Sequence, residues 1–468
     1  MFRQLIEYLR ERRVLILGFG REGRSTYDMI RRHLPDKHLG IGDRRDIDLH
    51  DSNVTLYGGD CYFDAMKDYD LVIKTPGISF RDVTVPEGVE VTCQTDLFLR
   101  FSQCTCVGVT GTKGKTTTST LIYQMVKKSG KTACLIGNIG IPVLDRLESG
   151  EPEIAVIEMS SHQLEFTTAS PHVAVMTNIY PEHLDHYNGF EGYVAAKMNI
   201  IRHQVGCDYF ICNAQQDLDK YFDFSLVIPT VIKVCSDGGA EDGEILAAAA
   251  SNDRLRGRHN KQNVCLAAAA ARCLGIGDEA IVSAIKDFGG IENRMEPVGE
   301  YGGIKFVNDS IATIPQAVQC AVEALGDVDT LIFGGMDRGI DYSGFVSFLE
   351  GSAVSNLIGL PDTGCRLCAE MREHGCRKNI IIVEDMEQAV DAAFRCTKQG
   401  TTCLMSPAAS SYNVYKDFEH KGKHFKDLVK KVTNKKLKHP RFDVRMLFHL
   451  FDGKITVLRL MYIQSFSR

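Results

Sequence analysis

The feature that most constrains this fold is a glycine-rich segment at residues 107–118, Val-Gly-Val-Thr-Gly-Thr-Lys-Gly-Lys-Thr-Thr-Thr. An apolar stretch, residues 104–109, runs into its turn, and a helix-like segment, residues 115–128, follows it. In phosphate-binding loops of this order, backbone N–H groups and the positive end of the helix dipole converge on a polyphosphate. We therefore expect Lys115 to reach the terminal phosphates and the Thr116 hydroxyl to bind Mg²⁺.

The general pattern of such loops, G-x-x-x-x-G-K-[ST], is not fully met. Val109 occupies the position of the first glycine, although Gly111 and Gly114 still bracket the turn. The alternative is an ordinary glycine-rich connection with an exposed lysine. Strand, turn, Lys-Thr pair and helix all occur in the required order, which favours the phosphate loop.

Length and composition indicate a multidomain globular protein. A chain of 468 residues is too long for one hydrophobic core, so two to four domains are expected. Hydrophobic residues make up 44% and charged residues 24% of the chain, as in soluble globular proteins. We expect no membrane insertion, because no apolar run approaches the length of a spanning helix. A net charge of −6 gives no support for nucleic-acid binding.

The N-terminus and the cysteines predict a cytoplasmic protein. Residues 1–13 are charged throughout and lack the apolar core of a signal peptide. The 16 cysteines are scattered, which indicates reduced thiols in the absence of an export signal. Cys365 and Cys368 form a C-x-x-C with Cys376 nearby, but no fourth zinc ligand is evident. Buried cysteines on one helix, residues 366–373, are therefore favoured over a zinc site.

Alternating strand and helix patterns predict an α/β fold built from three consecutive units with parallel sheets. The expected strands are residues 14–17, 39–42 and 71–73; then 104–109, 134–136, 154–157, 173–177 and 209–212; and finally 304–307, 330–333, 356–359, 380–383 and 402–405. The main expected helices are residues 24–34, 115–128, 193–201, 260–274, 315–325 and 386–397.

A second glycine-rich turn, residues 18–23, directly follows the first expected strand. It contains Gly18, Gly20 and Gly23, and Asp43 lies twenty residues further on, after the next strand. This spacing is that of a dinucleotide-binding turn and by itself suggests NAD. Arg44 follows Asp43, however, so a nucleotide with a diphosphate fits as well.

Polar residues at the ends of other strands predict a metal and ligand site, because open parallel sheets bind ligands at the carboxyl ends of their strands. Glu158 ends one strand and would face the phosphate loop, where it could hold Mg²⁺. A loop with His183, Asp185 and His186 follows the next strand and makes a metal site plausible. Lys197 alone reads as a solvated helix face.

The third unit repeats this arrangement. Three polar segments follow its expected strands: residues 308–313, 334–339 and 406–411. Each could be simple turn chemistry, but together they predict one ligand-binding rim.

These segments resemble the Mur ligases, from about residue 13 to about residue 432. The most specific are residues 110–117, 158–165, 258–263, 308–313 and 334–339, and residues 406–412 resemble the branch that adds D-glutamate. The resemblance implies a Rossmann-like domain for the UDP-substrate (residues 1–100), a central ATP-binding domain of the P-loop type with a parallel or mixed sheet (101–292), and a Rossmann-like amino-acid domain (293–432). Residues 433–468 form a basic tail without an assigned role.

The resemblance also implies roles for individual residues. The catalytic set is Lys115, Glu158, His183 and Lys197, and the metal set is Thr116, Glu158, His183 and Lys197, with Lys197 carried as a carbamate and two Mg²⁺ ions expected. The ATP-binding set is Gly111, Thr112, Lys113, Gly114, Lys115, Thr116, Thr117, Asn260, Asn263, Arg294 and Asp309. The UDP-substrate set, which replaces the NAD interpretation, is Gly18, Gly20, Gly23, Asp43, Arg44 and Asn138. The D-glutamate set is Arg338, Ser411, Tyr412 and Phe418.

The implied activity is ATP-dependent addition of D-glutamate to UDP-N-acetylmuramoyl-L-alanine in peptidoglycan synthesis, through an acyl phosphate and by a monomeric enzyme. Two departures concern the amino acid: Ile311 and Arg338 stand where members of the family have lysine. The alternatives are another amino-acid-adding Mur ligase, a folylpolyglutamate synthase-like ligase, or a P-loop nucleotide switch without ligase activity. A guanine-reading Asn-Lys-x-Asp motif, which such switches carry, does not occur in the sequence.

Overall fold

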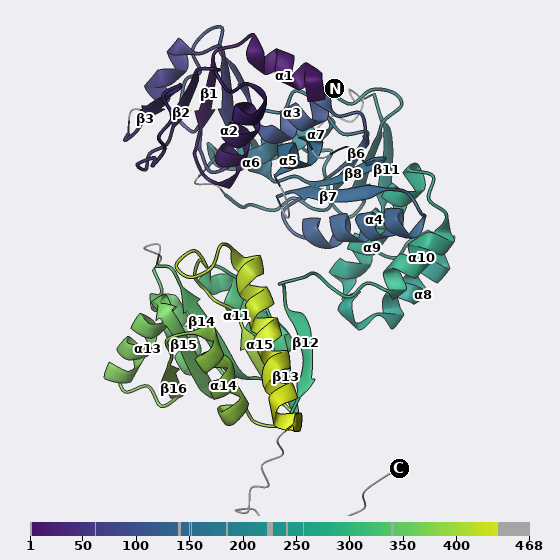
Figure 1. Cartoon of the computed structure of the whole chain (residues 1–468). Coiled ribbons are helices and arrows are strands. Elements are labelled where there is room, and N and C mark those ends of the chain that lie inside the picture. Colours follow the sequence, from purple (N-terminus) through teal and green to yellow (C-terminus); the bar gives the residue numbers. More distant parts are fainter. Residues whose placement is uncertain are drawn as a thin grey trace, which may run out of the picture. The chain divides into compact units, whose positions relative to one another are not determined.

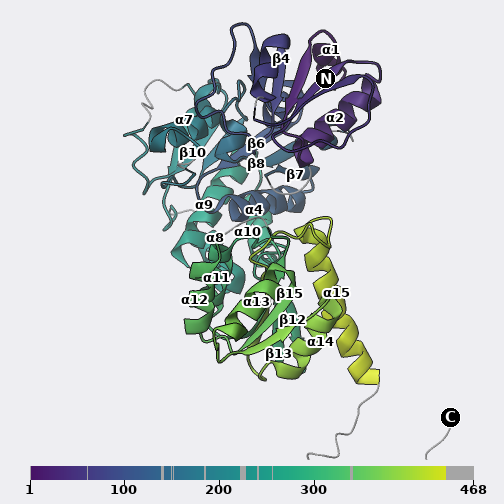
Figure 2. The same ribbon diagram turned by 90° about the vertical axis from the view of Figure 1, so that its left-hand side faces the viewer.

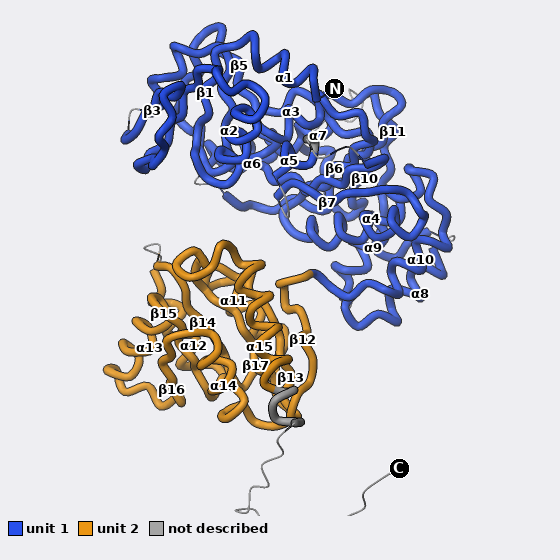
Figure 3. Tube along the Cα trace, viewed as in Figure 1, with its two compact units in different colours: residues 1–291 blue, residues 292–468 orange. Residues whose placement is uncertain are grey.

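The computed structural model describes residues 2–60, 62–138, 142–148, 150, 152–183, 186–221, 228–239, 242–255, 257–337 and 341–438. Contacts within the chain divide it into two compact units, Met1–Ile291 and Glu292–Arg468 (Figure 3). The first unit holds two sheets and the second unit holds one.

The first sheet has five parallel strands in the order β3-β2-β1-β4-β5 (Figure 1). They are β1 (Val14–Leu17), β2 (Leu39–Gly42), β3 (Val54–Tyr57), β4 (Leu71–Lys74) and β5 (Glu90–Thr92). Alternate residues of a strand point to opposite faces. Val14 and Ile16 of β1 pack with helices α1 (Phe2–Arg10) and α2 (Arg21–His33), while Leu15 and Leu17 pack with the 3₁₀ helix η1 (Tyr62–Asp68).

The second sheet has six parallel strands in the order β11-β10-β9-β6-β8-β7. They are β6 (Thr105–Thr110), β7 (Ala133–Gly137), β8 (Ile154–Glu158), β9 (Val173–Met176), β10 (Tyr209–Asn213) and β11 (Thr230–Val234). One face packs against α4 (Lys115–Lys128), α8 (Gly243–Ser251), α9 (Arg258–Cys273) and α10 (Asp278–Lys286). The other face packs against α5 (Val143–Glu148), α6 (Ser161–Leu164) and α7 (Gly189–Arg202). The core on this α5–α7 face is continuous with the core between the first sheet and helices α1 and α2.

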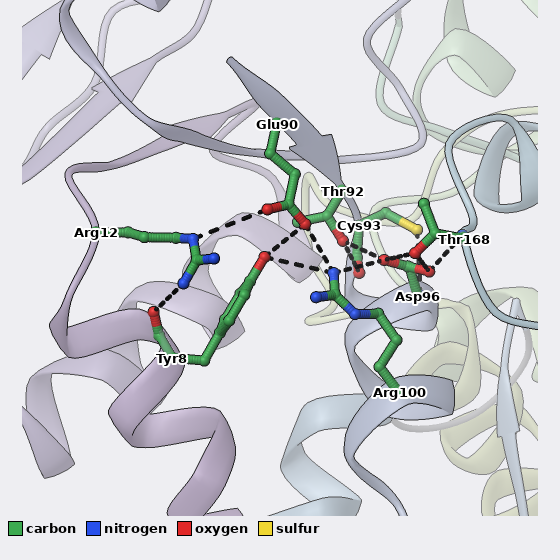
Figure 4. Close-up of polar contacts among 8 residues, drawn as sticks. All are labelled: Tyr8, Arg12, Glu90, Thr92, Cys93, Asp96, Arg100 and Thr168. Atoms are coloured by element: carbon green, nitrogen blue, oxygen red, sulfur yellow. Dashed lines mark hydrogen bonds and ion pairs between the residues drawn. The ribbon is translucent and has the colours of Figure 1, made fainter. Parts of the chain in front are cut away.

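A buried polar network also joins the two sheets of the first unit (Figure 4). Asp96, on α3 (Gln94–Phe101), accepts hydrogen bonds from the Thr168 backbone N–H at 2.6 Å and from the Thr168 hydroxyl at 3.0 Å. Arg100 donates to Glu90 at 2.8 Å and to Asp96 at 3.3 Å. Tyr8 donates to the same Glu90 at 2.6 Å. Because Thr168 leads into β9, this network holds α1, α3 and β5 against the second sheet.

The third sheet, in the second unit, has the order β12-β13-β17-β14-β15-β16, and all neighbours except β12 and β13 are parallel. Its strands are β12 (Glu296–Tyr301), β13 (Ile304–Asn308), β14 (Val328–Gly335), β15 (Asn356–Asp362), β16 (Asn379–Ile382) and β17 (Thr402–Met405). One face packs against α11 (Pro315–Leu325), α12 (Ser343–Gly351) and α13 (Thr363–Glu373). The other packs against α14 (Met386–Cys396) and α15 (Phe418–Lys438), as Figure 2 shows.

The predicted α/β class with parallel sheets is confirmed. Helix α15 extends into the range predicted as a tail, and residues 439–468, with the apolar stretch 455–463, lie outside the described residues. The division of residues 1–292 into a substrate domain and an ATP domain stays a prediction.

Three expectations about the chain's chemistry can be compared with the structure. No helix in the described part of the chain is long and apolar enough to cross a membrane. The cysteines of the described residues are free thiols. Cys368 is buried on α13, and the Cys365 thiol donates to the Gly359 and Val383 carbonyls, so these cysteines are structural residues of one helix.

Candidate functional site

The predicted phosphate loop connects β6 to α4 at the carboxyl edge of the second sheet. Gly111 and Gly114 have φ angles of +147° and +88°, which glycine adopts readily and other residues do not. A β-carbon on Gly111 would overlap the Thr177 hydroxyl, and one on Gly114 would lie 2.5 Å from Asn263 Oδ1. The turn is therefore packed between the end of β9 and helix α9, and both positions require glycine.

Two lysines converge on this turn. Lys115 Nζ donates to the carbonyls of Gly111 and Thr112 at 2.9 and 3.0 Å, and Lys197 Nζ, from α7, donates to Gly111 at 2.8 Å. Lys197 is 1% exposed, so it is not on a solvated helix face. Burial, followed by the nearby charge of Lys115, lowers the pKa of Lys197 well below its usual value. Burial thus favours the neutral amine form of Lys197 at this loop.

Glu158 ends β8 beside the loop and is 1% exposed. Asn138 Nδ2 donates to its Oε1 at 2.8 Å, whereas Oε2 is buried without a hydrogen-bond partner among the described residues. A buried carboxylate oxygen without a partner needs an explanation, and a role as a cation ligand is one. Thr116 is buried in the first turn of α4. The Glu158 carboxylate oxygens and the Thr116 hydroxyl oxygen are the kind of ligand that Mg²⁺ prefers.

The histidine loop lies near the same edge. His183 has a φ of +56°, and its ring centroid lies 4.8 Å from that of His162 on α6. Burial, with the charges of His186 and His183, lowers the pKa of His162 to about 3. His186 Nε2 lies 3.4 Å from Glu165 Oε2, the oxygen that also accepts from Lys74 Nζ at 2.8 Å. Leu184 and Asp185 lie outside the described residues.

No group of three or more His, Cys, Asp or Glu side chains in the described part of the chain is arranged to hold a metal. A metal site at the loop would therefore depend on Thr116, Glu158, His183 and Lys197 as a mixed set. Two other predicted nucleotide residues lie together at the start of α9, where Asn263 Nδ2 donates to Asn260 Oδ1 at 3.3 Å.

The glycine turn of the first sheet is equally tight. Gly18 has a φ of +90°, and a β-carbon there would overlap the Thr75 hydroxyl. A β-carbon on Gly23 would overlap the Gly18 carbonyl, which confirms the close turn that the spacing predicts. Gly20 has open space around its β-carbon position, so the turn is accessible from that side.

Asp43 is fixed within this turn. Its Oδ2 accepts from the Phe19 N–H at 2.8 Å and its Oδ1 from the Arg45 N–H at 2.9 Å. Burial alone would raise the pKa of Asp43, but these backbone hydrogen bonds outweigh it and lower the pKa. Arg44 is exposed and pairs with Asp60 at 2.9 Å.

Glu22, in the same turn, faces the second sheet. Gln163 Nε2, on α6, donates to Glu22 Oε1 at 3.2 Å, and Glu22 Oε2 is buried without a hydrogen-bond partner in the described structure. Burial raises the pKa of Glu22 to about 7, although the Gln163 hydrogen bond opposes the shift. This carboxyl group links the first glycine turn to the segment that follows Glu158.

In the second unit, Asp309 follows β13 and is 3% exposed. It accepts hydrogen bonds from the Ser406 hydroxyl at 2.7 Å and from the Met295 N–H at 3.0 Å. Burial raises the pKa of Asp309 to about 6 against these hydrogen bonds. Arg294 lies between Asn293 and Met295, which have φ angles of +62° and +40°. This backbone is strained, and such strain is common at functional sites.

The predicted amino-acid residues lie around the start of α15. Ser411 is buried and its hydroxyl has no partner within the described structure, whereas Tyr412 is 63% exposed. Phe418 is the first residue of α15. Arg338 lies outside the described residues, so its part in the pocket stays a prediction.

Comparison with known proteins agrees with this arrangement. The family description "Mur ligase middle domain" matches residues 109–271, and "Mur ligase, glutamate ligase domain" matches residues 293–409. The UDP-N-acetylmuramoylalanine–D-glutamate ligase of Acetivibrio thermocellus is 34% identical over 401 residues, which cover 80% of this chain and 85% of that protein. The chain belongs to the Mur ligase family. The ligase of the same name from Ligilactobacillus salivarius is 31% identical over 92% of this Mur ligase and 98% of its own length.

Solved structures agree on the fold. MurF from Acinetobacter baumannii superposes with a TM-score of 0.53 at 14% identity and covers 91% of this Mur ligase and 98% of its own chain. UDP-N-acetylmuramate-alanine ligase MurC from Thermotoga maritima gives a TM-score of 0.50 at 18% identity, with 90% and 100% covered. At these identities the likeness extends to the fold alone.

Sequence reasoning missed several residues that shape the site of this Mur ligase. Asn178 clamps the phosphate loop, because its side chain donates to the Lys113 carbonyl at 2.9 Å and accepts from the Lys113 N–H at 2.8 Å. His162 lies inside the recognised segment 158–165 but carried no predicted role. Asn178 directly follows the expected strand 173–177, and this strand-end position is the signal that could have found it.

Proposed function

We propose that this Mur ligase joins D-glutamate to UDP-N-acetylmuramoyl-L-alanine in peptidoglycan synthesis, driven by ATP hydrolysis. The observation that carries the proposal is the convergence of Lys115 and Lys197 on the Gly111 carbonyl, at the sheet edge where Glu158 also ends. The similarity to D-glutamate ligases over most of the chain supports the choice of substrates.

The reaction needs activation because a carboxylate does not condense with an amine near neutral pH. In the proposed sequence a carboxylate oxygen of the muramoyl-alanine substrate attacks the γ-phosphorus of ATP, and the bond to the bridging oxygen of ADP breaks. The amine of D-glutamate then attacks the acyl carbon of the resulting acyl phosphate. The C–O bond to phosphate breaks, inorganic phosphate leaves, and the amine loses a proton.

The chain's own residues would position and neutralise these anions. The N–H groups of residues 111–117 lie at the N-terminus of α4, and that terminus favours phosphate. Lys115 would exchange its present bonds to the loop carbonyls for the terminal phosphates. Asn260 and Asn263 would border the nucleotide from α9. The family resemblance also assigns ATP contacts to Arg294 and Asp309. Holding both reactants in place supplies much of the catalysis in reactions of this kind.

The oxygen-rich donor set fits magnesium. Glu158, with its buried unpartnered oxygen, and the Thr116 hydroxyl would hold one ion. His183 and Lys197 would serve a second ion with Glu158. A neutral amine reacts with CO₂ to give a carbamate, and the lowered pKa of Lys197 favours that neutral form. When bound, Mg²⁺ neutralises phosphate charge and stabilises charge that develops during transfer.

The remaining residues would bind the two other substrates. Gly18, Gly20 and Gly23, with Arg44, would receive the UDP group where the first turn is open, while Asp43 holds the turn in shape. Asn138 would contact the sugar-peptide end from its place beside Glu158. Arg338, Ser411, Tyr412 and Phe418 would hold D-glutamate. We further propose a monomeric enzyme that acts in the cytoplasm.

The direct test measures phosphate release with UDP-N-acetylmuramoyl-L-alanine, ATP and Mg²⁺. D-glutamate, L-glutamate, L-lysine and meso-diaminopimelate are compared as acceptors. We expect turnover with D-glutamate alone. Strong turnover with L-lysine and none with D-glutamate would show that the chain is a different amino-acid-adding ligase.

Lys115→Ala tests the assignment of the phosphate loop. We expect kcat to fall by about 10³-fold or more, because a positioned charge on the transferred phosphate is lost, while circular dichroism and thermal melting show an intact fold. Lys127→Ala, at the exposed end of the same helix, is the matched control and keeps its rate. A Lys115→Ala enzyme with most of its activity would rule out this nucleotide site.

A further inference from the structure

Lys421 is a buried lysine in the second unit that none of the predicted roles includes. It lies in the first turn of α15 and is 2% exposed. Its Nζ donates to the Gly334 carbonyl at 2.6 Å, at the carboxyl end of β14. No carboxylate of the described residues forms an ion pair with it, and burial alone lowers the pKa of Lys421 to about 7. Burying an ammonium group without a counter-charge is costly, so its presence calls for an anionic partner.

A second buried polar group belongs to the chain segment that contacts Gly335. A β-carbon on Gly335 would overlap the Ser410 carbonyl and would lie 3.4 Å from Lys421 Nζ, so Gly335 separates the lysine from the Ser410–Ser411 segment. Ser411 is 2% exposed, and its hydroxyl has no partner in the described part of the chain. The Lys421 ammonium group, with one backbone acceptor, therefore lies across Gly335 from the Ser410 carbonyl, and the next residue carries a buried hydroxyl group without a partner in the described residues.

The first turn of α15 is itself fixed over the sheet edge. A β-carbon on Gly422 would lie 2.5 Å from the Ser310 hydroxyl and 2.8 Å from Asn308 Nδ2. The helix therefore begins directly over the residues that follow β13, where open parallel sheets bind their ligands. Its N-terminus adds positive potential to that of the lysine.

We propose that Lys421 is a specificity-determining residue for the amino acid. Its ammonium group is the charge against which a carboxylate of the incoming amino acid is held, with the Ser411 hydroxyl as a second donor, so that the pocket selects a dicarboxylic amino acid. The inference rests on the proposed function, since it assumes that the second unit binds the amino acid. A neutral analogue would leave the buried charge uncompensated, and sites built around unpaired polar groups reject such analogues strongly.

The test compares D-glutamate with D-glutamine, its amide counterpart, in wild type and three variants. Lys421→Gln removes the charge, Lys421→Arg retains it, and Lys423→Gln, whose native lysine is exposed and pairs with Asp427, is the matched control. We expect Lys421→Gln to raise the KM for D-glutamate by at least about tenfold. The KM for ATP and kcat at saturating D-glutamate should stay within about threefold, and the preference for D-glutamate over D-glutamine should shrink. Lys421→Arg and Lys423→Gln should keep that preference.

Two outcomes would overturn the inference. One is an unchanged KM for D-glutamate in a folded Lys421→Gln enzyme. The other is a general loss, in which kcat and the KM for ATP worsen while the D-glutamate to D-glutamine ratio stays at the wild-type value, as a purely structural lysine predicts. If Lys421→Gln does not fold, Lys421→Arg decides: loss of the preference contradicts the inference and its retention supports it. A wild-type enzyme that is inactive with D-glutamate would contradict the proposed function instead. The preference of that enzyme for its true amino-acid substrate over the corresponding amide would still test Lys421.

Discussion

At the scale of single residues, Gly114 combines two constraints on the phosphate loop, a left-handed backbone and contact with Asn263. Gly130, just beyond α4, has a similar φ of +85° but open space around its β-carbon position. We expect Gly130→Ala to cost about 1 kcal/mol of unfolding free energy from the backbone alone. Gly114→Ala should cost more and should also raise the KM for ATP. Urea denaturation and steady-state kinetics measure both, and equal effects of the two variants would contradict the steric argument.

At the same scale, the buried Glu22 carboxyl group allows a prediction of how the unfolding free energy depends on pH. Burial raises the pKa of Glu22 in the folded chain to about 7, above the ordinary value of a glutamate, so folding favours the neutral carboxyl. The stability it contributes is full below the unfolded pKa and is lost as pH rises through about 7. Glu22→Gln, which cannot ionise, should therefore be more stable than wild type at pH 8, by about 2–3 kcal/mol.

The advantage of Glu22→Gln should disappear near pH 4.5, where the wild-type carboxyl is neutral in both states. Urea unfolding at pH 5 and pH 8 measures the difference. Glu87→Gln, at an exposed position, is the control and should show no such trend. A Glu22→Gln advantage that is the same at both pH values would exclude ionisation as its cause.

At the scale of elements, Asp96 fixes α3 to the strand that leads past the phosphate loop. Asp96→Ala would leave the Thr168 N–H and hydroxyl without their acceptor, and would leave Arg100 with less compensation. We expect a loss of about 2 kcal/mol in unfolding free energy, since Asp96 is fully buried and its hydrogen bonds to these donors are partly buried. Asp70, whose pairing with Arg13 is largely exposed, provides the control, and Asp70→Ala should have a much smaller effect. Similar losses in the two variants would show that the network does not hold the sheets together.

The elements best predicted from sequence are those with strong apolar periodicity. Strands β1 and β2 and helices α4 and α11 have the predicted bounds. The edge strands β3, β5, β11 and β12 were not predicted, and some of them carry few apolar residues. Strand β12, for example, reads Glu-Pro-Val-Gly-Glu-Tyr, which carries little strand propensity. Its pairing with β13 comes from tertiary context.

The candidate site was predictable where glycine turns and polar residues directly follow the ends of strands. Glycine turns, the Lys-Thr pair and Glu158 all lie where their spacing placed them. Lys197 was readable only through the family resemblance, because nothing local to its helix shows that α7 turns this lysine toward the Gly111 carbonyl. Lys421 was missed for the same reason: a lysine in a basic segment gives no local sign of burial.

At the scale of the whole molecule, we expect bound nucleotide to stabilise the folded protein, and this stabilisation should depend on Lys115. A ligand present at about 100 times its Kd stabilises the state it binds by about 2.7 kcal/mol. A non-hydrolysable ATP analogue with Mg²⁺ should therefore raise the melting transition of wild type, as measured by calorimetry. Lys115→Ala should show little gain and Lys127→Ala the full one. An equal gain in Lys115→Ala would place the nucleotide elsewhere.

The apolar core shared by the first two sheets has a practical consequence for the design of shorter fragments of this protein. A fragment that starts near Thr105 would keep its phosphate loop but would expose the apolar side chains that now pack against α2 and α3. Such a fragment should form inclusion bodies unless that surface is redesigned with charged residues. A fragment that ends at Ile291 instead follows the boundary between the two compact units.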